Sequence, residues 1–149
     1  MKKMLATILL TALCFSANAK ERTVDFSVYV INNYFTCDYV ETVTAKYIEA
    51  LGGEALDVEC RGGLPYDQWN RVTAVIDSAS ADEDNTVLNT LTIKSNSRMN
   101  RRITDNCSLS VKVLDGILPA FEVEEVSKRD TCWGSEGRFN YDLTLRAFN

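Results

Sequence analysis

The hydrophobic pattern begins with a mostly apolar run over residues 4–15, which two lysines precede and the small residues Ala17 and Ala19 follow. This order is typical of a secretory signal peptide. We therefore expect residues 1–19 to be removed on export and residues 20–149 to form a single domain. The run is shorter than the roughly 20 residues of a membrane-spanning helix, so we expect no membrane span. The expected location is periplasmic or extracellular.

Beyond this segment, apolar and polar residues alternate over residues 24–30, which predicts a half-buried strand. Apolar residues then recur at helical spacing, and we predict a helix over residues 38–51. Asp38 and Glu41 resemble a capping box at its start. Gly52 follows its last turn, where a left-handed C-terminal cap is expected.

The rest of the chain alternates in the same way, interrupted by polar or glycine-containing turns such as Asp115-Gly116. Clean alternation indicates one buried and one solvated face, which favours an antiparallel sheet. One helix and many strands predict an α+β domain, with the helix packed on or cradled by a mostly antiparallel sheet of about five to seven strands. The predicted strands cover residues 56–60, 72–77, 86–94, 107–114, 121–126 and 138–148.

Four of the five cysteines follow the leader: Cys37, Cys60, Cys107 and Cys132. An even number in an exported chain predicts disulfides, because the compartment is oxidising. Three pairings are allowed, and local nesting favours Cys37 with Cys60 and Cys107 with Cys132. If the strands on either side of the helix are parallel neighbours, the first pair meets at one sheet edge. The alternative for Cys37 is a reactive thiol, since a helix N-terminus lowers a thiol pKa.

Composition excludes several classes of function. The chain carries a net charge of −5, which is unfavourable for nucleic-acid binding. It contains no histidine, which excludes histidine-based triads, HExxH zinc sites and histidine pH switches. The cysteines lack the close spacing of zinc-binding pairs. We therefore expect no cofactor and no metal centre, and we assign no catalytic residue.

Candidate partner-binding residues lie in four segments. The aromatic residues of "LPYDQW" and the tryptophan of "CWGSEG" are candidate contact anchors, with packing in the core as the alternative. An acidic loop and a basic segment, "KSNSRMNRR", flank the strand over residues 86–94, which places opposite charges roughly 30 Å apart. Such polarity can orient a partner; the alternatives are solvated loops or, for the acidic loop, a cation site. The candidates are Tyr66, Trp69, Asp82, Glu83, Asp84, Arg98, Arg101, Arg102 and Trp133.

These features favour a small exported, disulfide-stabilised module that binds another protein. Its most concrete form is an inhibitor or immunity-type protein of the bacterial envelope that blocks a basic enzyme. One alternative is a thiol-dependent or carboxylate-dependent periplasmic enzyme, although sequence does not show which carboxylates face each other. The other is a structural component of the envelope. No motif indicates a known family.

Overall fold

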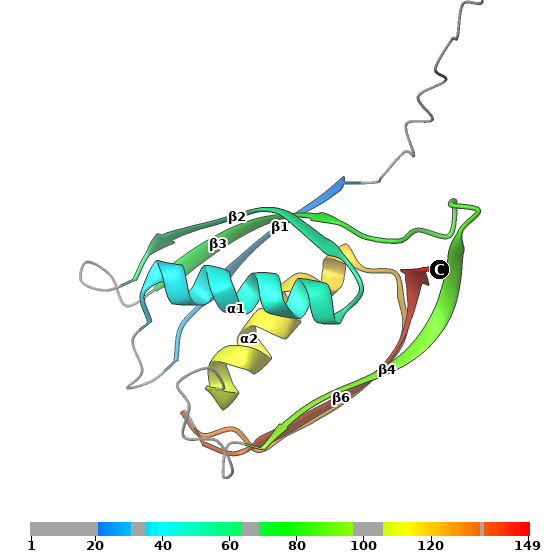
Figure 1. Cartoon of the computed structure of the whole chain (residues 1–149). Coiled ribbons are helices and arrows are strands. Elements are labelled where there is room, and N and C mark those ends of the chain that lie inside the picture. Colours follow the sequence, from blue (N-terminus) through cyan, green and yellow to red (C-terminus); the bar gives the residue numbers. More distant parts are fainter. Residues whose placement is uncertain (1–20, 31–34, 64–68, 97–105, 135) are drawn as a thin grey trace, which may run out of the picture.

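A computed structural model describes residues 21–30, 35–63, 69–96, 106–134 and 136–149. Within these ranges, two helices and six strands form the α+β fold that was predicted, with two three-stranded antiparallel sheets instead of one. Figure 1 shows α1 and α2 between the two sheets. The elements are β1 (Glu21–Val28), α1 (Cys37–Ala50), β2 (Glu54–Gly62), β3 (Asn70–Asp77), β4 (Thr86–Asn96), α2 (Cys107–Ile117), the 3-10 turn η1 (Leu118–Ala120), β5 (Val123–Asp130) and β6 (Arg138–Phe148).

In each sheet, the middle strand follows both of its neighbours in the sequence. In the N-terminal sheet the order is β1-β3-β2, and in the C-terminal sheet it is β4-β6-β5. Because β3 pairs antiparallel with both neighbours, β1 and β2 run in the same direction but β3 separates them. The condition under which Cys37 and Cys60 were expected to meet at one sheet edge, parallel neighbouring strands, is therefore not met.

Helix α1 forms where the helical spacing predicted it and packs mainly against β2. Its end is the predicted left-handed cap: Gly52 has a φ of 81°, and the N–H of Gly53 donates to the carbonyl of Ile48 at 3.1 Å. The predicted capping box is absent, since the N-cap is Thr36 and its side chain makes no capping bond. The Glu41 carboxylate instead accepts the N–H of Cys60 at 2.8 Å, which ties the helix to β2.

The prediction of a strand over residues 107–114 is wrong, because this segment forms helix α2. The described residues therefore contain two helices, whereas the sequence predicted one. Both sheets and α1 pack against α2, so its apolar residues are not confined to one stripe and their sequence also fits a strand. Asp115-Gly116 is likewise not a turn. Gly116 lies in the helix against the ring of Phe26, where an added Cβ would come within 2.4 Å of a ring carbon.

Two disulfides join Cys37 to Cys60 and Cys107 to Cys132. The favoured pairings are confirmed, and the alternative of a free reactive thiol at Cys37 is wrong. The first disulfide joins the start of α1 to β2, and the second joins the start of α2 to the residues after β5. Paired cysteines of this kind indicate an oxidising compartment outside the cytoplasm.

Glu122, between η1 and β5, connects the two sheets. Its carboxylate accepts hydrogen bonds from the N–H of Ala81 at 2.8 Å, the hydroxyl of Ser80 at 3.1 Å and the guanidinium of Arg22 in β1 at 3.2 Å. Arg146 of β6 forms an ion pair with it at 3.6 Å. The Ala81 N–H, followed by Ser80 and Arg22, holds the pKa of Glu122 below its ordinary value against the opposing effect of burial.

We expect Glu122→Gln to destabilise the fold at neutral pH, because it removes the charge that these donors stabilise. A lowered pKa means that the stabilisation is complete above the unfolded-state pKa and is lost as pH falls through the folded-state pKa. The difference from the unmodified protein should therefore disappear in acid. Urea denaturation across this pH range measures it. Glu124→Gln, at an exposed position of β5, is the control, and equal effects of the two variants at neutral pH would contradict this role.

Candidate protein-interaction site

The connection between β5 and β6 presents Trp133 to solvent. This residue is 89% exposed, the largest value for any large hydrophobic residue in the described ranges. The alternative that Trp133 packs in the core is therefore wrong. The described residues of this turn, 131–134 and 136–138, are hydrogen-bonded to one another: Trp133 and Glu136 exchange hydrogen bonds of 2.9 and 3.1 Å, and the N–H of Thr131 donates to the carbonyl of Arg138 at 2.8 Å.

The Trp133 turn is anchored to the first turn of α2. Cys132, which forms a disulfide with Cys107, directly precedes Trp133 in the sequence. The N–H of Ser108, one of the donors that a helix start leaves unpaired, donates to the carbonyl of Gly134 at 3.0 Å. Gly137 has a φ of 115°, and an added Cβ would lie 2.4 Å from a backbone oxygen across the turn. The backbone conformation at residue 137 therefore requires glycine.

Replacing both Cys107 and Cys132 by alanine should lower the free energy of unfolding by roughly 3 kcal/mol, the loop-entropy value for a loop of this size. It should also raise hydrogen exchange at the Ser108 amide, because the turn loses its covalent attachment. The control replaces Cys37 and Cys60, which close a loop of similar length. Faster exchange at Ser108 in the control but not in the first variant would contradict the anchoring role.

Three cationic side chains, Lys94, Arg129 and Arg138, lie next to the Trp133 turn and are named here the cationic cluster. The register of the C-terminal sheet pairs Lys94 with Asn140 and Asn140 with Arg129, so these residues form one row across three strands. Arg138 lies two residues from Asn140 along β6, on the same face. All three cations are exposed, and within the described part of the chain none forms an ion pair or a side-chain hydrogen bond.

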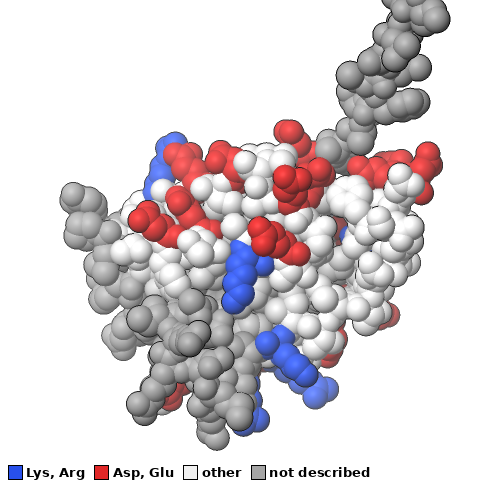
Figure 2. Space-filling view, in the orientation of Figure 1, with Lys and Arg blue, Asp and Glu red and all other residues white. Residues whose placement is uncertain are grey.

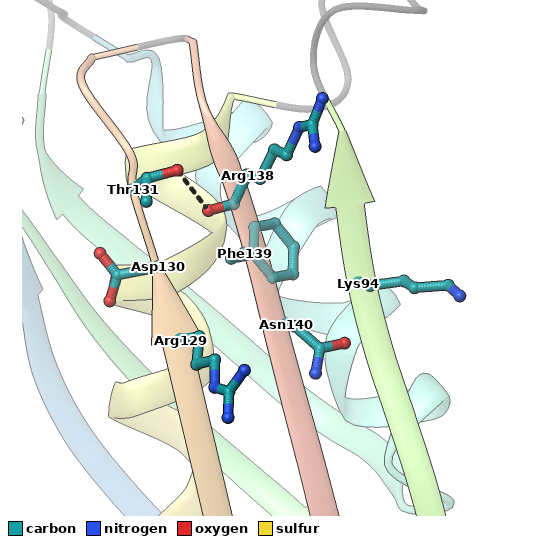
Figure 3. A pocket seen from close by; sticks show the side chains of 7 residues that line it. All are labelled: Lys94, Arg129, Asp130, Thr131, Arg138, Phe139 and Asn140. Atoms are coloured by element: carbon teal, nitrogen blue, oxygen red, sulfur yellow. Dashed lines mark hydrogen bonds between the residues drawn. The ribbon is translucent and has the colours of Figure 1, made fainter.

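The cationic cluster borders a hollow of about 630 Å³ whose lining also includes Asp130, Thr131, Phe139 and Asn140. The carboxylate of Asp130 forms an ion pair with Lys128 at 3.6 Å. Figure 3 shows Lys94, Asn140 and Arg129 side by side from three strands, with Arg138 nearer to the turn. A second hollow of about 240 Å³ is lined by Trp133, Glu136 and Gly137 and also by Thr131 and Arg138. Since these two residues line both hollows, the indole and the cations belong to one continuous surface.

Lys128 is not part of this surface, because carboxylates neutralise it on the other face of the sheet. Its ammonium lies 2.6 Å from Asp115 and 3.6 Å from Asp130. The hydroxyl of Tyr141 donates to Asp115 at 2.8 Å, and burial together with Asp115 raises the pKa of Tyr141 far above its ordinary value. These contacts fix β5 and β6 to α2 behind the cationic cluster.

The acidic candidates lie away from the cationic cluster. Asp82, Glu83 and Asp84 precede β4, whereas Lys94 lies near its other end. The arginines of the predicted basic segment lie outside the described residues, so the separation of opposite charges stays a prediction. The Glu83 carboxylate accepts the N–H of Ser80 at 2.9 Å, which closes a turn. Figure 2 shows acidic side chains gathered over α1, β2 and the connection from β3 to β4.

Trp69 is half-exposed at the start of β3 and stacks on Tyr29, with ring centroids 4.8 Å apart. It is not among the described residues that line the two hollows. The remaining candidates, Tyr66, Arg98, Arg101 and Arg102, lie outside the described residues. Sequence reasoning missed Arg129 and Arg138. The alternation of β6 was a usable signal, since it assigns Arg138 to the polar face, but the strand order that brings Arg129 beside it is not encoded locally.

A row of carboxylates crosses the end of the N-terminal sheet, where Asp77 of β3 pairs with both Glu21 and Glu54. Burial raises the pKa of Asp77, and Glu83, Glu54 and Glu21 raise it further by repulsion. One buried oxygen of Asp77 has no hydrogen-bond partner in the described structure. In that same part of the chain, no group of three or more histidine, cysteine or acidic side chains is arranged to hold a metal ion.

Asp77→Asn should stabilise the protein at neutral pH, because the amide carries no charge to bury or repel. A raised folded-state pKa means that the carboxylate destabilises the fold at pH values above it, and that this effect is relieved as pH falls towards the unfolded-state pKa. The gain should therefore shrink in acid. Thermal unfolding at several pH values measures it, with the exposed Asp57→Asn as control. Lower stability of Asp77→Asn at neutral pH would contradict this account.

Comparison with protein-family models, with curated proteins and with solved structures finds no match for this chain. Neither of the two described helices has the length and apolar character needed to cross a membrane.

Proposed function

We propose that this chain is an exported protein-binding module that contacts its partner through the Trp133 turn and the neighbouring cationic cluster. The observation that carries the proposal is the 89% exposure of Trp133 on a turn held by a disulfide. Tryptophan and arginine are the residue types most enriched among those that dominate binding energy. A large exposed indole with no cover is unfavourable in water, and a partner surface would remove that cost.

The rigidity of the turn supports binding rather than a solvated loop. Its backbone bonds, its disulfide and its attachment to α2 are formed without a partner. Little conformational freedom is then lost when the indole enters a partner pocket, which favours affinity. A projecting turn of fixed shape suits an inhibitor or immunity-type protein, because it can enter a concave surface such as an enzyme cleft.

Export through a cleaved leader and a bacterial envelope location are parts of the same proposal. The supporting features are the lysine-led apolar segment at the N-terminus and the two disulfides. A thiol-dependent enzyme is excluded for the four described cysteines, since all are paired. The carboxylate row at Asp77 lies on the outer face of a sheet, which gives an enzyme weaker support than the tryptophan gives a binding module.

Trp133→Ala should abolish or greatly weaken retention of the partner. The immobilised, disulfide-intact protein is incubated with an envelope extract at low salt, and a stoichiometric partner is quantified by mass spectrometry. Loss of a central tryptophan anchor typically costs 2 kcal/mol or more, which corresponds to a weakening of roughly thirtyfold.

The control for this experiment is Leu88→Ala, since Leu88 is 46% exposed on the same sheet at the far end of β4. It should retain the partner as the unmodified protein does. If no stoichiometric partner is retained, or if Trp133→Ala and Leu88→Ala behave alike, the proposal is wrong.

A further inference from the structure

We infer that the cationic cluster receives an acidic, extended segment of the protein partner, with at least two carboxylates seated among Lys94, Arg129 and Arg138. This inference rests on the proposed function and specifies the chemistry of the partner at that surface. It also revises the expectation of a basic partner, which came from the net charge of −5. The lining of the two hollows contains the three cations of the cationic cluster and two carboxylates, Asp130 and Glu136, and Asp130 is paired with Lys128.

Four other basic residues, Arg22, Arg61, Lys128 and Arg146, each form an ion pair with a carboxylate of this chain. Among the described residues, the three members of the cationic cluster form no ion pair, and neither do Arg71 and Lys112. The cationic cluster differs from these two single cations because its three members lie together on one face of a sheet. Like charges gathered on one face repel each other, and an anionic ligand would remove this repulsion.

The spacing of the cations also suits an extended peptide. Neighbouring strands lie about 4.8 Å apart, so Lys94 and Arg129 are about 10 Å apart at the backbone, on either side of Asn140. Alternate side chains of an extended peptide repeat at about 6.7 Å, and the long cationic side chains can adjust to that interval. Arg138 lies two residues from Asn140 along β6, at that same interval, so one carboxylate fits between Lys94 and Arg129 and the next fits beside Arg138.

The charged neighbours of the cationic cluster along β6 limit the direction in which an acidic segment can lie. Asp142, on the same face of β6, accepts hydrogen bonds from Thr92 at 2.8 Å and from the amide of Asn140 at 2.7 Å. Its negative charge would repel an acidic segment that continued along β6 in that direction. At the other end lies Arg138, which also lines the hollow beside Trp133. The segment is thus directed towards the indole.

The size of the hollow favours a peptide segment over a single anion. Its volume of about 630 Å³ corresponds to roughly 20 water molecules at the density of the liquid, far more than one phosphate ion occupies. The lining combines the cations with Thr131 and Asn140, whose polar side chains offer contacts to the uncharged parts of a peptide, while Phe139 is buried in the core below.

The test is a titration of the full disulfide-intact protein, followed by nuclear magnetic resonance of its backbone amides. The probes are a short end-capped peptide of alternating glutamate and alanine, the matched glutamine peptide, and inorganic phosphate. The glutamate peptide should bind saturably, with shifts confined to the adjoining ends of β4, β5 and β6 and to the Trp133 turn. Added salt should weaken it.

The variant for this test combines Lys94→Gln, Arg129→Gln and Arg138→Gln. It should bind the glutamate peptide at least about tenfold more weakly, as expected for the loss of several exposed charge contacts. The control combines Arg71→Gln and Lys112→Gln, which remove exposed cations elsewhere and should leave binding unchanged.

Three results would overturn the inference: equal affinity for the glutamate and glutamine peptides, unchanged binding by the triple variant, or phosphate binding as tight as that of the peptide. A comparison of the Trp133→Ala variant with the triple variant distinguishes the failure of this inference from the failure of the proposed function. If Trp133→Ala loses the cellular partner while the triple variant retains it fully, the turn is the binding element and the acidic segment is excluded. If both variants lose it, the two conclusions stand together.

Discussion

Both sheets depend on the burial of α2 between them. Each sheet has only three strands and needs an apolar layer on its inner face, and α2 supplies much of that layer to both. Its most buried side chains are almost fully enclosed, and each aliphatic one contributes on the order of 1.5–3 kcal/mol through the hydrophobic effect. They are Cys107, Leu109, Val113, Leu114 and Ile117.

The same helix also determines how the candidate site is displayed. Its first turn carries the disulfide to Cys132 and the amide that binds the carbonyl of Gly134, so the Trp133 turn extends from the best-packed part of the molecule. At the other end of the helix, Asp115 neutralises Lys128 and binds the hydroxyl of Tyr141. Core packing and the presentation of the indole are therefore parts of one arrangement.

Local sequence patterns predicted the elements whose environment is simple. The alternation over residues 138–148 predicted β6 with its correct bounds, because this strand has one buried face and one exposed face. The cysteine spacing favoured the correct disulfide pairs. Helix α2 could not be recognised, since packing from several sides removes the single apolar stripe, and Gly116 reads as a turn residue when it in fact admits the ring of Phe26.

The candidate site was predictable only in part for a related reason. Trp133 was identified from its place after a cysteine in a glycine-flanked loop, but whether it was buried depended on packing. Arg129 and Arg138 are unremarkable where they stand in the sequence. They form a site with Lys94 only because β6 is inserted between β4 and β5, and strand order is a property of the whole fold.

The central claim is that the surface around Trp133 contacts an acidic segment of a protein partner. The most direct measurement places a photo-crosslinking amino acid at position 133 in cells that export the protein, and identifies the attached peptide by mass spectrometry. Position 90, exposed on β4, serves as the reference. The account predicts one dominant partner attached only from position 133, through a peptide rich in aspartate and glutamate. No adduct, or the same adducts from both positions, would contradict it.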